Sequence, residues 1–138
     1  NNSAIGYNAS GNEALTIDMT VPYAAGALAS TINDIYKWDQ SFYNNSLVSQ
    51  ATKEAIFTPF LNGYGLGWAI GNLKNTGEFN YSHTGGIEGF STIILRFPET
   101  QKLIVVLSNV EGYPTDQMAL HLKNYQININ LNLYLDLI

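Results

Sequence analysis

Hydrophobic residues at helical spacing predict a helix that begins near Ser30-Thr31. Either hydroxyl can cap this helix, and the pattern Thr31-x-x-Asp34 resembles a capping box in which Asp replaces the usual Glu. We expect the helix to end at Asn44-Asn45, since paired asparagines are poor helix formers. The apolar residues expected to form its buried stripe are Ile32, Ile35, Trp38 and Phe42.

Two shorter helices are predicted on either side of a strand-rich region. Ser49 can cap a helix that must stop before Pro59, because the residue that precedes a proline is disfavoured in helical conformation. After Pro114, residues 115–124 follow a helical pattern, with Met118, Leu122 and Tyr125 on one side. Residues 1–26 are rich in Gly, Ala, Asn and Ser without a sustained period, which predicts mostly irregular chain.

From Tyr64 the pattern changes to that of strands. The predicted strands cover residues 64–70, 79–84, 90–97 and 103–109, and the last two are joined by the polar turn 98–101. This arrangement predicts an antiparallel meander flanked by helices, an α+β fold. Apolar residues also alternate with polar ones over residues 125–137, so we expect an extended tail.

Composition narrows the classes of function. The chain has 138 residues, 46% of them hydrophobic and 12% charged, which fits one soluble globular domain. Its net charge is −5 and its few basic residues form no cluster, which argues against nucleic acid as a partner. The absence of cysteine excludes disulfides and thiol catalysis. No apolar run approaches the length of a membrane span, and we expect no metal or other cofactor.

Three segments, in a fixed order, carry a family resemblance. They are residues 24–38, the run Tyr64-Gly65-Leu66-Gly67-Trp68, and residues 82–90 followed by Phe97-Pro98 and residues 106–109. Together they resemble the serine hydrolases that include class C β-lactamases, penicillin-binding D-alanyl-D-alanine carboxypeptidases and related esterases. The resemblance implies a partial β-lactamase-like domain over residues 1–138, with an irregular and helical part (1–62) and a sheet with a C-terminal helix and tail (63–138).

The resemblance also implies which catalytic elements to look for. Such enzymes combine a Ser-x-x-Lys pair, a Tyr-x-Asn loop and a Lys-Thr-Gly or His-Thr-Gly strand, because serine needs a neighbouring base to become a nucleophile. His83-Thr84-Gly85 matches the third element. No serine of this chain is followed three residues later by lysine, so we expect the nucleophile and its base upstream of Asn1. Tyr43-Asn44-Asn45 satisfies Tyr-x-Asn, but it follows residues 24–38 instead of preceding them, and we interpret it as coincidence.

The site residues follow from that match. His83 and Thr84 are expected to act in catalysis, and Thr84 also to hydrogen-bond the carboxylate of a substrate. A histidine is charged only below roughly pH 6.5, so it holds a carboxylate less firmly than lysine does. Gly85 is expected to let a substrate approach the backbone, and the N–H of Gly86 to be an oxyanion donor. Thr115 is expected near the substrate carboxylate. The structural alternatives are an ordinary strand histidine, a threonine chosen for strand propensity and a glycine turn.

Other prominent residues are assigned to structure. Asp34 and Trp38 are expected to be a helix-start acid and a core aromatic. Gly89 is expected to form only a turn, and His121, which lacks a partner at metal-ligand spacing, to lie on a helix surface. The residues expected to pack or to line a pocket rather than react are Tyr64, Gly67 and Trp68.

The leading functional hypothesis is the C-terminal portion of a serine acyl-transfer hydrolase that acts on a peptide, ester or β-lactam and is inactive as this chain alone. A non-catalytic remnant or binding module, and a structural unit that recruits a partner through a sheet edge, are the alternatives. The uncharged strand from Leu103 to Leu107 is expected to pair with a second copy or with the missing N-terminal half. The resemblance implies a secreted or cell-envelope location.

Overall fold

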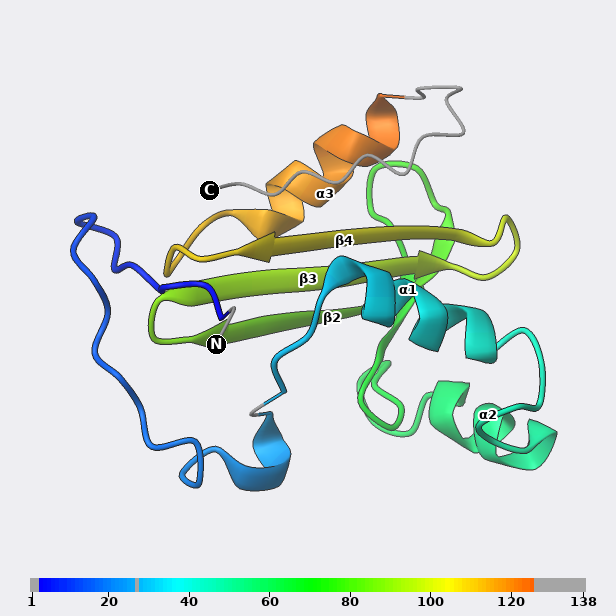
Figure 1. The fold of residues 1–138 in the computed structure, drawn as a ribbon. Helices are drawn as coiled ribbons and strands as arrows, with labels where there is room; N and C mark the ends of the chain where they lie inside the picture. Colours follow the sequence, from blue (N-terminus) through cyan, green and yellow to red (C-terminus); the bar gives the residue numbers. More distant parts are fainter. Residues whose placement is uncertain (1–2, 27, 126–138) are drawn as a thin grey trace. The chain divides into compact units, whose positions relative to one another are not determined.

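The computed structural model describes residues 3–26 and 28–125. It is an α+β fold, as predicted, with three α-helices and a four-stranded antiparallel sheet (Figure 1). The tail predicted over residues 125–137 lies outside the described residues apart from Tyr125. The elements in chain order are η1 (Tyr23–Ala25), α1 (Ile32–Ser41), α2 (Gln50–Phe57), β1 (Ala69–Asn72), β2 (Phe79–Ile87), β3 (Phe90–Phe97), β4 (Lys102–Ser108) and α3 (Thr115–Asn124).

The sheet is a meander in the order β1-β2-β3-β4, which confirms the predicted topology. In the β1–β2 pair, Ala69 lies opposite Ser82 and Asn72 opposite Phe79. β1 begins later than the predicted strand over 64–70, because residues 61–64 form a tight turn of their own. β2 continues past the predicted end at residue 84, since strand pairing persists through the two glycines that follow.

Helix α1 begins as predicted and ends earlier than predicted. The Thr31 hydroxyl accepts a hydrogen bond from the backbone N–H of Asp34 at 3.2 Å, as in a capping box. The Asp34 carboxylate accepts from the Thr31 hydroxyl at 3.1 Å, whereas a full capping box would use the Thr31 backbone N–H. The helix stops at Ser41, before the predicted end at 44–45, because the Phe42 N–H already turns to the carbonyls of Asp39 and Gln40.

The predicted buried stripe of α1 is wrong in part. The side chains that the helix buries most deeply are Asp39 and Ser41, not the apolar residues at helical spacing. Ile32 and Ile35 are half-buried, and Trp38 is 40% exposed. The reason is a buried ion pair between Asp39 and Arg96 of β3, which turns that side of the helix inward.

Helices α2 and α3 agree closely with the sequence. The Ser49 hydroxyl accepts from the N–H of Thr52 at 3.2 Å, and α2 ends two residues before Pro59. Helix α3 covers the predicted residues 115–124, with Ala119 fully buried. Met118 and Leu122 are half-buried as expected, but Tyr125 is 73% exposed because it lies past the last helical residue as the C-cap.

The chain divides into two compact units, each with its own buried residues. The first comprises residues 1–29, 84–93 and 105–138, and its described core includes Ile93, Val106 and Ala119. The second comprises residues 30–83 and 94–104 and is rich in aromatic side chains. Its core includes Trp68, Leu95 and Phe97, which are each less than 5% exposed.

The first unit anchors the irregular N-terminal segment through backbone hydrogen bonds. The Tyr7 N–H donates to the Asn109 carbonyl at 2.8 Å, and the Glu111 N–H donates to the Tyr7 carbonyl at 2.8 Å. Apart from η1 and isolated bridges at Tyr7, the described part of residues 1–26 is irregular, as predicted. Within residues 3–26 and 28–125, no helix has the length and apolar character needed to cross a membrane.

Candidate functional site

The His83 side chain, in the middle of β2, is held by a tyrosine. His83 Nε2 lies 2.7 Å from Tyr64 Oη, a short hydrogen bond, and the ring centroids are 6.0 Å apart at an interplanar angle of 60°. Both side chains are exposed and belong to the second unit. The histidine of the predicted motif is therefore solvent-accessible, with one of its two ring nitrogens engaged.

A tight turn places Tyr64 for this contact. Leu61 and Tyr64 exchange backbone hydrogen bonds of 3.4 and 2.9 Å across Asn62 and Gly63. Asn62 and Gly63 have φ values of 52° and 73°, which is the requirement of a two-residue turn of type I′ and explains the Asn-Gly sequence. The Gly63 carbonyl also accepts from the Ile70 N–H at 2.7 Å, which ties the turn to β1.

Of the rest of the Tyr-Gly-Leu-Gly-Trp run, Gly65 and Trp68 are buried, whereas Leu66 is 64% exposed and Gly67, which was expected to pack or to line a pocket, is exposed. Trp68 is 4% exposed and stacks on Trp38, with centroids 5.6 Å apart and planes 12° apart. Gly65 has no room for a side chain, because a Cβ there would lie 2.5 Å from the Ile56 carbonyl oxygen and 2.8 Å from Ile70. Through its stacking on Trp68, Trp38 contributes to aromatic packing, although it is more exposed than a core residue would be.

Thr84, Gly85 and Gly86 continue β2 beyond His83, within the first unit, and all three are exposed. A Cβ on Gly85 would overlap the Thr92 hydroxyl of β3, so close strand packing already requires this glycine. Among the described residues, no heavy atom beyond the chain neighbours of Gly86 lies within 4 Å of the position that a Cβ on Gly86 would take. The space beside Gly86 is therefore open to a ligand.

Thr115 differs from the other predicted site residues in its burial. It is the first residue of α3, it is 6% exposed, and its backbone N–H donates to the Tyr113 carbonyl at 2.7 Å. His121, on the same helix, is exposed as predicted. The roles of Thr84, Gly86 and Thr115 in chemistry stay predictions.

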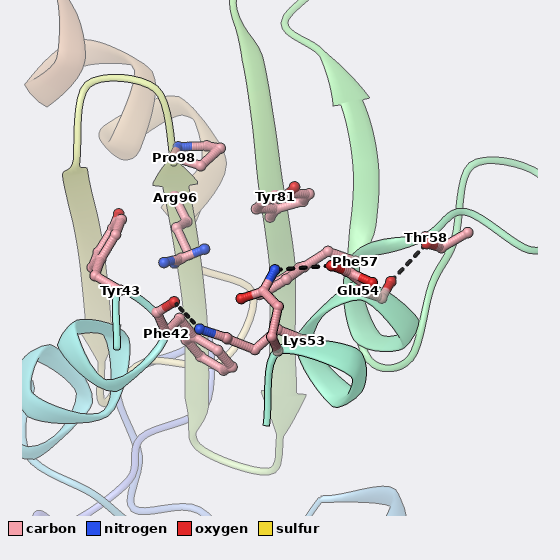
Figure 2. Close-up of a pocket in the computed structure, with 10 residues that line it drawn as sticks. Phe42, Tyr43, Lys53, Glu54, Phe57, Thr58, Tyr81, Arg96 and Pro98 are labelled. Carbon is pink, nitrogen blue, oxygen red and sulfur yellow. Dashed lines mark hydrogen bonds between the residues drawn. The ribbon is translucent and has the colours of Figure 1, made fainter. Parts of the chain in front are cut away.

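A second polar feature of the structure was not predicted from the sequence. Arg96 of β3 donates from Nε to the Asp39 carboxylate of α1, and these residues are 3% and 1% exposed. The guanidinium lies between Tyr43 on one side and Tyr81 on the other (Figure 2). Four aromatic rings surround its central carbon, with centroids 4.7 to 5.9 Å away: Phe42, Tyr43, Phe57 and Tyr81. The sequence feature that could have indicated this ion pair is Arg96 itself, a single charged residue in the otherwise apolar second half of β3.

A cavity of about 440 Å³ opens beside this arginine (Figure 2). Lys53, which is 9% exposed, lies at the cavity and donates to the carbonyls of Phe42 and Asn44 at 3.3 and 3.0 Å. Within residues 3–26 and 28–125, the Tyr43 hydroxyl is buried without a hydrogen-bond partner, and burial raises the pKa of Tyr43, with the charge of Arg96 opposing the shift. Tyr43 thus packs against Arg96, and the coincidental character of the Tyr43-x-Asn45 match stays a prediction.

Comparison with known proteins identifies the family. The family model described as Beta-lactamase matches residues 2–126. Penicillin-binding protein 4* of Bacillus subtilis (strain 168) is 36% identical over 92 residues, which cover 62% of this chain and 20% of that protein. PbpX of the same strain, assigned as a penicillin-binding protein, is 29% identical over 113 residues, which cover 79% of this chain and 27% of that protein.

The aligned region therefore spans between a fifth and three tenths of the length of these relatives. No solved structure matches the chain. The family model covers far more than half of the 138 residues, and the names of both relatives contain the term penicillin-binding protein. The chain belongs to the beta-lactamase family of serine hydrolases.

Proposed function

We propose that this chain supplies the substrate-binding strand of a serine acyl-transfer hydrolase. The complete protein would attack the carbonyl of a peptide, an ester or a β-lactam, form an acyl-enzyme and release it to water. The observation that carries the proposal is the exposure of His83, Thr84, Gly85 and Gly86 in succession on β2, with open space beside Gly86.

Each of these groups has a chemical task in the proposal. His83 and the Thr84 hydroxyl donate hydrogen bonds to a carboxylate of the substrate. The Gly86 N–H donates to the oxyanion that develops on the attacked carbonyl. The second oxyanion donor and the nucleophile come from a Ser-x-x-Lys element that these 138 residues do not contain. As relatives are named penicillin-binding proteins, we place the whole protein at the cell envelope.

A non-catalytic binding module is the second candidate. The observation that favours it is the same missing Ser-x-x-Lys element, since a β2 strand with intact donors can hold a carboxylate without performing chemistry. We therefore expect the isolated chain to hydrolyse neither a chromogenic β-lactam nor a p-nitrophenyl ester, because nucleophile and base together supply most of the rate. Burst kinetics with clear turnover by the isolated chain would contradict this part of the proposal.

The test of the enzyme proposal uses the complete protein with substrates that carry a carboxylate. We expect His83→Ala to lower kcat/KM by roughly a hundredfold, because a charge-assisted or well-placed hydrogen bond is lost. His83→Lys should retain activity, since an ammonium group also donates to a carboxylate. His121→Ala, on the exposed side of α3, is the matched control and should behave as wild type. Unchanged kinetics in His83→Ala would assign the histidine to structure.

A further inference from the structure

In the hydrogen bond between Tyr64 and His83, the chemistry of the two groups decides which one donates. We propose that Tyr64 is a positioning residue for His83: the phenol donates to Nε2, so that neutral His83 carries its hydrogen on Nδ1 and offers this N–H to a carboxylate. The contact that supports it is the 2.7 Å separation of Tyr64 Oη and His83 Nε2. The choice of a carboxylate as ligand rests on the proposed function, whereas the position of the hydrogen does not.

The direction follows from the acidity of the two groups. A phenol is a much stronger acid than the N–H of a neutral imidazole, and an imidazole nitrogen with a free lone pair is a stronger base than a phenol oxygen. The O–H···N arrangement is therefore the more favourable one for this pair. When one ring nitrogen accepts a hydrogen bond, the hydrogen of the neutral ring must lie on the other, so the partner of Nε2 decides the tautomer.

The backbone holds Tyr64 in place for this role, although its ring is 42% exposed. Its carbonyl accepts from the N–H of Phe60 at 2.9 Å and that of Leu61 at 3.4 Å, and its own N–H donates to the Leu61 carbonyl at 2.9 Å. Tyr64 also forms a bridge with Ala69, which in turn lies opposite Ser82, the neighbour of His83. Fixed backbones on both sides reduce the entropy lost when the two side chains meet.

The arrangement changes what the histidine contributes at neutral pH. If Nε2 carried the hydrogen, Nδ1 would hold a lone pair, and this lone pair would repel a carboxylate that approached the Nδ1 side of the ring. With Nε2 occupied by the phenol, the remaining ring nitrogen is a donor whether the ring is neutral or charged. His83 can therefore donate to a carboxylate without carrying a positive charge.

The experiment measures which ring nitrogen carries the hydrogen. The whole 138-residue chain is labelled with ¹⁵N, and long-range ¹H–¹⁵N correlation spectra are recorded near pH 8.5, about two units above the reference value of a free imidazole side chain. The chain has 2 histidines, so exposed His121 provides an internal reference for a ring in solvent. We expect the Nδ1–H pattern for His83 and the solvent pattern, with Nε2–H dominant, for His121.

Two variants assign the effect to the hydroxyl of Tyr64. Tyr64→Phe keeps the ring and should return His83 to the pattern of His121, while Tyr36→Phe removes a hydroxyl from an exposed tyrosine of α1 and should change nothing. Amide spectra that superimpose on wild type show that each variant is folded. The wild-type spectrum alone is already decisive, since an Nε2–H pattern for His83 would overturn the proposal, as would an Nδ1–H pattern that survives in Tyr64→Phe.

The same variant separates this inference from the proposed function. In the complete protein, Tyr64→Phe should raise KM for carboxylate-bearing substrates roughly threefold to tenfold, the value of about one hydrogen bond, and leave KM for the matching methyl esters unchanged. An Nδ1–H tautomer in a protein without hydrolase activity would retain the positioning role and refute the proposed function. If Tyr64→Phe changes KM equally for the acids and for their methyl esters, His83 does not bind the carboxylate of the substrate, and that part of the proposal is wrong.

Discussion

Arg96 of β3 and Asp39 of α1, 57 residues apart in the sequence, form an ion pair that is almost completely buried. The Nε of Arg96 donates to the Asp39 carboxylate, and aromatic rings pack around the guanidinium. Transfer of both charges from water is costly, so the pair stabilises the second unit only while both partners are present. Loss of one partner leaves an uncompensated charge in an apolar environment.

Asp39→Leu is therefore expected to destabilise the fold by about 3–5 kcal/mol, measured as the free energy of unfolding in urea. Asp39→Leu combined with Arg96→Met should recover most of this loss, because the pair is then replaced by apolar side chains. Lys37→Ala is the matched control, since it breaks an ion pair with Asp34 whose side chains are 75% and 61% exposed, and it should have little effect. Equal losses in the single and the double variant would contradict the interpretation.

The buried hydroxyl of Tyr43 predicts a loss of stability at alkaline pH. Burial raises the pKa of Tyr43 and of Tyr81, with Arg96 opposing both shifts, so the folded state holds these protons more firmly than the unfolded state. The corresponding stability is fully present below the unfolded value of about 10 and is lost as pH rises through the folded value. Urea midpoints measured from pH 8 to pH 11 should fall above about pH 10.

Tyr43→Phe should weaken this alkaline decline and leave stability at neutral pH unchanged or higher by about 1 kcal/mol, because the hydroxyl it removes has no hydrogen-bond partner among the described residues. Tyr125→Phe, at a residue that is 73% exposed, should retain the wild-type pH profile. A destabilised Tyr43→Phe would mean that the hydroxyl has a favourable partner in solution.

Gly89 lies where two backbone segments of the first unit come close together, so a side chain at this position should destabilise the fold. It has a φ of 80°, and a Cβ there would lie 2.7 Å from the Cα of Gly6 and 2.8 Å from the Cβ of Ala14. Gly89→Ala should therefore cost more than the roughly 1–2 kcal/mol of a left-handed residue alone. Gly112→Ala is the control, since Gly112 has a φ of 70° with nothing within 4 Å, so it carries the conformational cost without the clash. Similar losses of unfolding free energy in both variants would disprove the close approach.

The elements that the sequence predicts well depend on local signals. Thr31 and Ser49 each cap a helix through a hydroxyl, and the bounds of β3 and α3 follow from patterns within the segments themselves. The Asn62-Gly63 turn has an equally local signal, because this pair is typical of a type I′ turn, but no turn is predicted there and the predicted strand begins directly after it, at residue 64.

The features that the sequence does not predict depend on partners far along the chain. Periodicity places apolar residues of α1 inward, whereas the structure buries Asp39 because Arg96 lies opposite it. Tyr64 and His83 each belong to a recognised motif, but their contact spans 19 residues and depends on the register of β1 against β2. Periodicity indicates which apolar side chains share one face of a helix or strand. It carries no information on which polar groups from distant parts of the chain come into contact.

The outer edge of β4 leads to the last prediction, that two copies of the chain pair through residues 103–107. In the part of the chain that the structure describes, β4 is the last strand of the sheet and pairs on one side with β3. Near this edge, Tyr7 forms backbone hydrogen bonds with residues 109 and 111, which follow β4 in the sequence, so it does not cover the outer edge of β4 itself. No charged residue lies between Lys102 and Asn109, so the strand lacks the usual protection against edge pairing. We expect a dimer in light scattering, Val105→Lys to shift it to monomer, and Leu28→Lys, which adds the same charge at a 94% exposed residue outside the sheet, to remain dimeric. A wild-type chain that stays monomeric at high concentration, with fast amide exchange in residues 103–107, would contradict this prediction.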